Sequence, residues 1–295
     1  MADIAYEAQV SKEFSAAMLT RMTEAKGGLL TDLGELREIT GAETTTFNRA
    51  DDGTTSSTAP NMYASGNHNT GGTYDAIELG PTFEYAFEKI PDVKFRKSQI
   101  NYKGYIPQKL IRQLDKAEDV KVIQILDSAT TNIVQTKGSV LLVDKVLVGL
   151  TDAANISTLI GIAKGAKVEA EDTPDKRAFV KMVMNKETYK VLYASEKLIN
   201  SDYVGDSKKN DGSTKNEFYG CEVVIMKKPP VELPNGVIYF IPSGVLGYAR
   251  WKAADTSDSS FDLKNEDSWT FIAKKSFGAA LIEAESVTKF VATAF

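Results

Sequence analysis

The feature that most constrains the fold is a polar segment, residues 50–73, that lies between two β-like stretches. Seventeen of its 24 residues are Gly, Thr, Ser, Asn or Asp, and its only large apolar side chains are Met62 and Tyr63. Connections inside a compact domain are usually about 4–6 residues long. A loop of this length is either disordered or ordered by a surface that it contacts. We interpret it as the tip of an extended arm that docks on a partner, which points to assembly before catalysis.

The sequences on both sides of this segment predict the two strands of an extended β-hairpin. Residues 43–49 are rich in Thr, and residues 74–90 are strongly β-like, with apolar and polar side chains alternating around Ile77 and Leu79 and again over residues 83–88. A period of two places one set of side chains on each face of a strand. The aromatic set is Phe83, Tyr85 and Phe87, and the acidic set is Glu84 and Glu88.

A two-stranded hairpin is marginally stable alone in water, so it needs a surface to lie on. We therefore expect Phe83, Tyr85 and Phe87 to pack against a neighbouring subunit, together with Met62 and Tyr63 of the tip. The carboxylates Glu84 and Glu88 are expected to face solvent or a neighbouring subunit. The alternative left open is that they form an acid/base pair in an enzyme.

Composition excludes several classes of protein. The formal net charge is −5, from 35 Lys and Arg against 40 Asp and Glu, which argues against a protein that reads nucleic acid by neutralising phosphates. The single cysteine, Cys221, permits no internal disulfide and is expected to be a small buried hydrophobe. No apolar run approaches 18 residues and no signal peptide is recognisable, so we expect a soluble protein made in a reducing cytoplasm, without a membrane partner.

The sequence contains no recognisable catalytic or cofactor motif. Walker A, G-x-G-x-x-G and G-x-S-x-G patterns are absent. One Cys and one His cannot supply a zinc site of Cys and His ligands. The histidine, His68, lies in the polar segment, where a Gly/Asn loop does not hold its side chain in a fixed position. We therefore expect no cofactor and no metal, and we assign no catalytic residue.

Hydrophobic periodicity predicts the other elements of the first half. Residues 4–26 fit an amphipathic helix that ends at two glycines, and residues 1–42 together read as an N-terminal arm that packs on something else. A short strand is expected within 93–100. A long helix is expected from Pro107 to Gly138, with a break near Asp115 left open and the charged residues of 115–121 on its exposed face.

The second half has the mixed strand and helix patterns of an α/β domain. Residues 140–150 are helix-compatible, and Asn185 is placed to cap a short helix that follows a buried strand at 178–184. Residues 254–260 read as a polar linker. Strands are predicted at 218–226, 237–241 and 245–251, and again within 261–295.

The order of these segments resembles the HK97-type major capsid protein of tailed bacteriophages. The most telling stretch is Arg177–Trp251. It contains Phe179-Val-Lys-Met-Val-Met-Asn185-Lys-Glu-Thr-Tyr189, then Leu198-Ile-Asn-Ser-Asp-Tyr203, Phe218-Tyr-Gly220-Cys-Glu-Val-Val and Val237-Ile-Tyr-Phe-Ile241. These are similar to the strand, helix and strand order of the family. The resemblance implies an α+β fold with an N-arm, an extended hairpin called the E-loop, a P-domain with a spine helix, and an α/β A-domain.

The resemblance implies the following limits: N-arm 1–42, E-loop 43–91, P-domain 92–139 with 254–295, and A-domain 140–253. It also implies a structural protein, not an enzyme, that self-assembles into hexamers and pentamers of an icosahedral capsid. The A-domain would sit near the capsomer axes, while the hairpin and the arm would reach neighbouring subunits. No motif in the sequence pairs a particular Lys with a particular Asn, so we assign no covalent cross-link between subunits.

The partners implied are other copies of the chain, packaged double-stranded DNA contacted non-specifically, and scaffolding, portal or decoration proteins. The location implied is the virion, with assembly in the host cytoplasm. Another shell protein remains as an alternative, an encapsulin-like nanocompartment that encloses cargo proteins instead of a genome.

Overall fold

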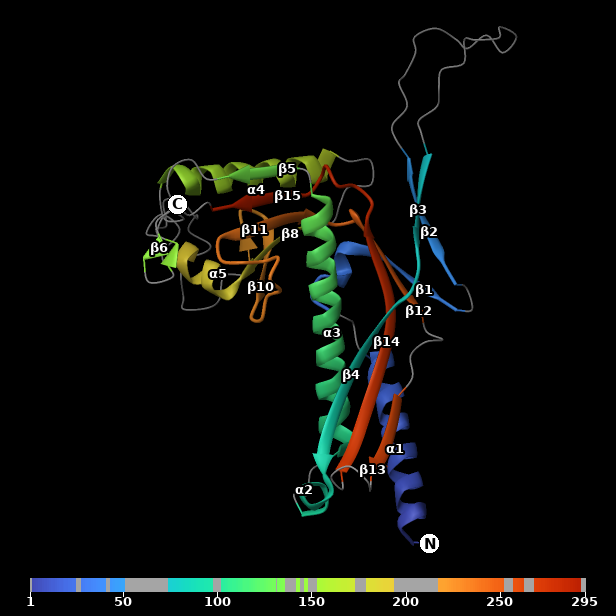
Figure 1. Ribbon diagram of the computed structural model, residues 1–295. Helices are drawn as coiled ribbons and strands as arrows, with labels where there is room; N and C mark the ends of the chain where they lie inside the picture. Colours follow the sequence, from blue (N-terminus) through green and yellow to red (C-terminus); the bar gives the residue numbers. More distant parts are fainter. Residues whose placement is uncertain are drawn as a thin grey trace, which may run out of the picture.

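A long helix forms the axis of the molecule, with one sheet along its length and a second at its C-terminal end (Figure 1). This is a computed structural model. It describes residues 2–24, 28–40, 43–50, 74–97, 102–130, 132–135, 142–143, 146–147, 153–172, 179–193, 217–251, 257–262 and 268–292. Met62, Tyr63 and His68 lie outside the described residues. The long helix is α3 (Tyr102–Ala129).

The first sheet is built around β14 (Ser268–Leu281). On one edge of β14, β4 (Thr82–Pro91) pairs antiparallel with it over ten positions. The other edge carries two strands, one at each end of β14: β13 (Ser257–Asp262) and β12 (Leu246–Trp251). A fifth strand, β1 (Gly34–Ile39), pairs parallel with β12.

The N-terminal helix α1 (Ala2–Glu24) packs on this sheet and on α3. Val10, Phe14 and Met18, spaced four residues apart, are fully buried with Trp269 and Phe271 of β14. The ring centroids of Phe14 and Phe271 lie 5.0 Å apart. The predicted helix is confirmed, and the surface on which it packs belongs to its own chain. A further contact of the arm with another subunit stays a prediction.

The second sheet has six strands in the order β5-β15-β11-β8-β10-β9. Their bounds are β5 (Asn132–Gln135), β15 (Thr288–Val291), β11 (Val237–Pro242), β8 (Val180–Asn185), β10 (Cys221–Met226) and β9 (Glu217–Phe218). The central strands β8 and β11 are buried at every position. This explains why their sequences are mostly apolar, since both faces of such strands are covered; the exceptions in β8 are Lys181 and Asn185, which are buried with hydrogen-bond partners.

Each face of the six-stranded sheet has its own core. Alternate side chains of β8, Met182 and Met184, pack with α4 (Ala153–Asp172) and α5 (Lys186–Tyr193). The side chain between them, Val183, packs on the opposite face with residues of α3 and with Leu30 and Leu33. The period of two therefore splits one strand between two cores and fixes α3 against the second sheet.

The remaining elements are short. The predicted hairpin is confirmed for β2 (Thr45–Ala50) and β3 (Tyr74–Leu79), which pair antiparallel along their whole described length. The prediction of 74–90 as one hairpin strand is wrong, because the strand is divided at Gly80 and Pro81 and its aromatic part, β4, pairs with β14 instead. The 3-10 helix η1 (Thr31–Leu33) precedes β1. Two short strands, β6 (Leu142–Val143) and β7 (Val146–Leu147), stand where a helix was compatible with the sequence.

Several sequence-based predictions are wrong in the first half of the chain. The strand expected within 93–100 is instead helix α2 (Asp92–Lys97), whose Asp92 accepts a hydrogen bond from Trp269 Nε1 at 2.8 Å. The long helix begins at Tyr102, before Pro107, and runs unbroken through Asp115. Strand β1 was missed because its partner β12 is far away in the sequence.

The sheets also cross the limits expected for the domains. Strand β12, from within 140–253, belongs to the sheet of β14, while β5 and β15 belong to the six-stranded sheet. Strand β13 occupies part of the expected linker 254–260. In the described residues no helix is both long and apolar enough to span a membrane.

We expect Asn185→Ala to lower the free energy of unfolding by about 2 kcal/mol, because it removes a helix cap and leaves a buried carbonyl unpaired. Asn185 Oδ1 accepts a hydrogen bond from the Thr188 amide at 2.7 Å, and its Nδ2 donates to Leu233 O at 3.3 Å and Asn235 Oδ1 at 2.8 Å. Urea unfolding measures the change. The control is Asn235→Ala, which removes only an exposed partner, and an equal loss in both variants would contradict the cap.

Candidate functional site

The exposed face of β4 carries the aromatic residues singled out in the sequence. Phe83, Tyr85 and Phe87 are 45%, 61% and 68% exposed. The register places Tyr85 opposite Lys274 and Phe87 opposite Ile272 of β14. These five residues define what we call the aromatic face. Contiguous exposed apolar surface of this kind commonly marks a protein interaction site.

One cation belongs to the aromatic face itself. Lys274 Nζ lies 4.8 Å from the centroid of the Phe83 ring. Such a contact at an exposed site contributes about 0.5–1 kcal/mol. The Lys274 stem thus covers part of the apolar surface while its charge stays at the rim.

The opposite face of β4 turns toward α3 in the same chain. Ala86 and Ile90 are buried there in the core shared with α1 and α3. Both oxygens of Glu88 accept hydrogen bonds from Lys109 Nζ of α3, at 2.5 and 2.6 Å. This hydrogen bond raises the pKa of Lys109. The expectation that Glu88 faces solvent or a neighbouring subunit is therefore wrong, because its strand parity places it against α3.

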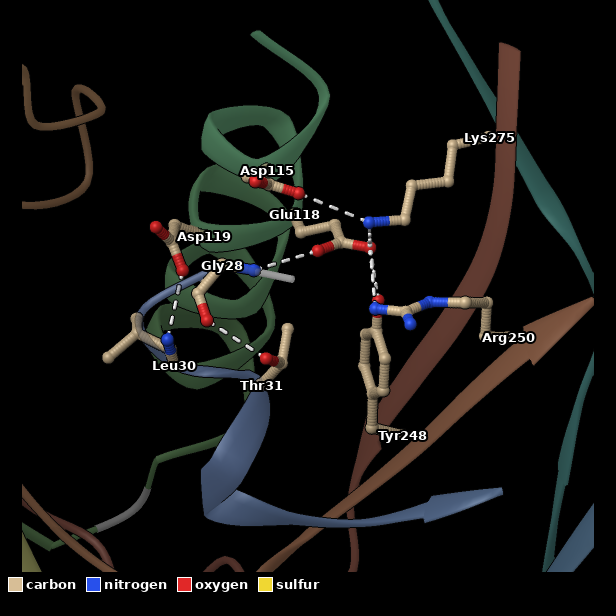
Figure 2. A network of polar contacts seen from close by, with 9 residues as sticks. All are labelled: Gly28, Leu30, Thr31, Asp115, Glu118, Asp119, Tyr248, Arg250 and Lys275. Atoms are coloured by element: carbon tan, nitrogen blue, oxygen red, sulfur yellow. Dashed lines mark hydrogen bonds and ion pairs between the residues drawn. The ribbon is translucent and has the colours of Figure 1, made fainter. Parts of the chain in front are cut away.

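A buried polar network lies between α3, the first sheet and the turn that follows α1 (Figure 2). We call it the polar joint. It consists of Asp115, Glu118 and Asp119 of α3, Tyr248 and Arg250 of β12, Lys275 of β14, and the turn at Gly28–Thr31. It connects the N-terminal segment, the long helix and the first sheet at one point.

Glu118 is the centre of the polar joint and is fully buried. Its carboxylate accepts hydrogen bonds from the Gly28 amide at 2.9 Å and from the Tyr248 hydroxyl. Lys275 Nζ lies 2.6 Å from Glu118 Oε1, and Arg250 Nη2 lies 3.8 Å from the same oxygen. A buried carboxylate is tolerated only with such partners, because removing a charge from water is expensive.

Asp119 holds the turn that follows α1. Its Oδ1 accepts the Leu30 amide at 3.0 Å, and Thr31 Oγ1 donates to Gly28 O at 2.9 Å within the turn. A Cβ on Gly28 would lie 2.8 Å from the backbone carbonyl oxygen of Asp115, so glycine lets the chain pass this close to α3. Lys181 of β8 donates to Leu29 O at 2.8 Å, which ties the turn to the second sheet as well.

The pKa values in the polar joint depend on burial and on the charges of its three carboxylates and two cations. The carboxylates are Asp115, Glu118 and Asp119, and the cations are Arg250 and Lys275. Burial raises the pKa of Asp119 to about 6, opposed in part by hydrogen bonds from the Leu30 and Leu29 amides. Burial also raises the pKa of Asp115, and Lys275 opposes that rise. Burial, together with the charge of Glu118, raises the pKa of Tyr248 above its ordinary value.

Sequence reasoning missed the polar joint. It assigned the charged residues of 115–121 to an exposed helix face, but Glu118 and Asp119 are buried. A helical period separates a buried from an exposed face only where the buried face is apolar. Here Glu118 and Asp119 point inward, and their hydrogen-bond partners lie 89 to 130 residues away in the sequence. The signal available in the sequence was Gly28, which was read only as the end of a helix.

The described residues contain no group of three or more His, Cys, Asp or Glu residues suited to a metal ion. Cys221 is buried, as predicted, and its Sγ lies 3.6 Å from Ala163 O.

Comparison with known proteins gives matches only at the level of structure. No protein-family model and no curated protein matches the sequence. The capsid structure of cyanophage P-SCSP1u superposes with a TM-score of 0.68 at 12% identity, covering 92% of this chain and 89% of that chain. The chain has the HK97-type capsid fold.

Two further solved structures share the HK97-type fold. The capsid of a native GTA particle matches with a TM-score of 0.62 at 14% identity, covering 90% of each chain. A virus-like particle from Pyrococcus furiosus matches with a TM-score of 0.57 at 13% identity, covering 95% of this chain and 99% of that chain. The α+β class predicted from the order of segments is confirmed.

We expect Lys275→Met to destabilise the subunit by about 3–5 kcal/mol, because it leaves the buried Glu118 without its closest cation. The matched control is Lys274→Met, one residue away on the opposite face, which should cost about 1 kcal/mol or less. Urea unfolding of both variants tests the difference. Equal effects would show that the polar joint does not depend on Lys275.

The raised pKa of Asp119 should make stability depend on pH. A carboxyl with a pKa of about 6 in the folded state, against 3.8 ordinarily, binds its proton more tightly when folded. Its stabilising contribution is complete below about pH 4 and is lost as the pH rises through about 6. Relative to Asp119→Asn, the wild-type subunit should lose about 2 kcal/mol of unfolding free energy between about pH 4.5 and about pH 8. Urea unfolding at the two pH values measures this, and a constant difference would contradict it.

Proposed function

We propose that this chain is a major capsid protein that self-assembles into an icosahedral shell of hexamers and pentamers around a phage genome. The observation that carries the proposal is the fold. The match extends over at least nine-tenths of the chain in the structures of a cyanophage capsid, a GTA particle capsid and a virus-like particle. A chain that shares a fold with shell proteins over nine-tenths of its length supports a role as a shell subunit.

The parts correspond to proposed domains. Residues 1–42 are the N-arm, 43–91 the E-loop, 92–139 with 254–295 the P-domain, and 140–253 the A-domain. The A-domain is proposed to lie near the capsomer axes. The E-loop is proposed to reach over the adjacent subunit, with Met62 and Tyr63 of its tip among the contacts.

The aromatic face is the proposed contact between subunits. Phe83, Tyr85 and Phe87 are held on a strand that is bonded to β14 along its whole length, so no ordering cost remains for that backbone when a partner arrives. Burial of their exposed area would contribute roughly 25 cal/mol per Å² of apolar surface. Such modest contacts repeat at every subunit of a closed shell, which is how weak interfaces give a stable particle.

The role proposed is structural and not enzymatic. The location proposed is the virion, after assembly in the host cytoplasm. Packaged double-stranded DNA would be contacted non-specifically and weakly, since the formal net charge of −5 argues against extensive neutralisation of phosphates. Scaffolding, portal and decoration proteins are further proposed partners.

The contents of the particle separate the two kinds of shell. A capsid expressed during infection should contain nuclease-protected double-stranded DNA. An encapsulin-like nanocompartment should contain a cargo protein and no genome. Extraction of purified particles, followed by gel analysis of nucleic acid and protein, distinguishes them.

We expect that replacing Phe83, Tyr85 and Phe87 together by Thr leaves a folded subunit that no longer forms closed shells. Thr keeps β-propensity in β4 while removing the apolar contact. Sedimentation velocity and negative-stain microscopy measure assembly, and circular dichroism measures folding. Val168→Thr, an equally exposed apolar position on α4, is the control and should assemble normally. Normal particles from the triple variant would refute the contact.

A further inference from the structure

One face of the first sheet carries four small residues where the hairpin meets it. Gly247 and Ala249 of β12 pair with Ala280 and Gly278 of β14, so the four side chains form a two-by-two block on one face. We call this block the seat. Its absence of large side chains leaves room for another layer of chain to approach the sheet closely.

Phe47 of β2 occupies the seat from one strand of the hairpin. Its side chain is 1% exposed and packs with Leu79, Ala249 and Trp251. A Cβ added to Gly247 would lie 2.8 Å from Cγ of the Phe47 ring, well inside ordinary contact distance. Only glycine at position 247 lets the ring rest this close to the sheet.

Arg37 of β1 holds the same ring and the same strand. Its guanidinium carbon lies 4.3 Å from the centroid of the Phe47 ring. Its Nη1 donates a hydrogen bond to the carbonyl of Thr46 at 2.7 Å. Both the side chain of Phe47 and the backbone beside it are therefore fixed to the first sheet.

The other strand of the hairpin reaches the seat through its backbone. Gly80 follows β3 directly, and its carbonyl oxygen would lie 2.8 Å from a Cβ added to Gly278. The Trp251 ring would lie 3.1 Å from the same Cβ. A Cβ on Gly80 itself would meet nothing within 4 Å. The close approach of the chain at Gly80 to β14 thus depends on glycine at position 278 and not on glycine at position 80.

We propose that the seat sets the angle at which the β2–β3 hairpin leaves the subunit and so positions it for its neighbour. The inference rests on the proposed function and adds a mechanism to it. Figure 1 shows the hairpin on the opposite side of α3 from the six-stranded sheet. Gly80 and Pro81 connect its strand β3 to β4. Strands of six residues are about 20 Å long. A small tilt at the seat therefore becomes a larger displacement at the far end of the strands.

The test adds one methyl group on either side of the same contact. Gly247→Ala and Gly278→Ala place it in the contact, and Gly80→Ala places it where space is free. We expect wild type and Gly80→Ala to form regular shells by negative-stain microscopy and sedimentation velocity. The two seat variants should give folded subunits by circular dichroism and lose regular shells. Regular shells of wild-type size from both seat variants would overturn the proposal.

Hydrogen exchange on the unassembled full-length chain tests the seat independently of shell formation. Phe47→Leu weakens the contact without adding an atom to the sheet, so misfolding from an added methyl group does not enter. Its β2 and β3 amides should exchange on the order of tenfold faster than those of wild type, because burial of an aromatic ring is lost there. Amides of β8 and β11 should be unchanged. Wild-type exchange throughout β2 and β3 would overturn the seat.

The shell-formation and hydrogen-exchange experiments together distinguish an error in the proposed role of the seat from an error in the proposed function. If neither wild type nor Gly80→Ala forms shells, the capsid function fails, and the exchange experiment still decides whether the seat holds the hairpin. If both form shells and the seat variants also do, the function stands and the seat is wrong.

Discussion

The fold depends on one buried carboxylate. Glu118 lies on the long helix α3, accepts hydrogen bonds from the N-terminal turn and from β12, and is neutralised by Lys275 of β14. These partners come from three separate segments, and the carboxylate satisfies them all at zero exposure. Since an unpaired charge at this depth would cost several kcal/mol, the helix, the turn and the sheet can coexist only in this arrangement. Apolar packing brings the elements together, and the polar joint determines their relative position.

The two cores beside this joint follow a simple rule. Strands β8 and β11 are buried on both faces, so each contributes alternate side chains to a core with α4 and α5 and to a core with α3. The aromatic face of β4 is the exception on the first sheet, where the same alternation leaves Phe83, Tyr85 and Phe87 in solvent. Within one chain, alternation thus builds the interior in one place and leaves aromatic side chains exposed in another.

Local patterns in the sequence predicted the elements whose determinants are local. The cap at Asn185, the buried strand before it and the alternation of β4 depend on neighbouring residues, and the structure contains all three. The sequence did not predict β1, whose parallel partner is distant, or α2, whose short apolar pattern fits a strand equally well. The polar joint was beyond reach for the same reason, because charged residues on a helix read as solvent-exposed unless their distant partners are known.

The central strand β14 has a mechanical consequence. It is hydrogen-bonded to β4 on one edge and to β12 and β13 on the other, and all three ladders are antiparallel. The bonds of such ladders run perpendicular to the strands. Tension applied along β4 is therefore resisted in shear by ten residue pairs at once, and not by opening one bond after another. A pull on β4 is therefore carried directly into β14, whose Trp269 and Phe271 lie in the core shared with α1 and α3.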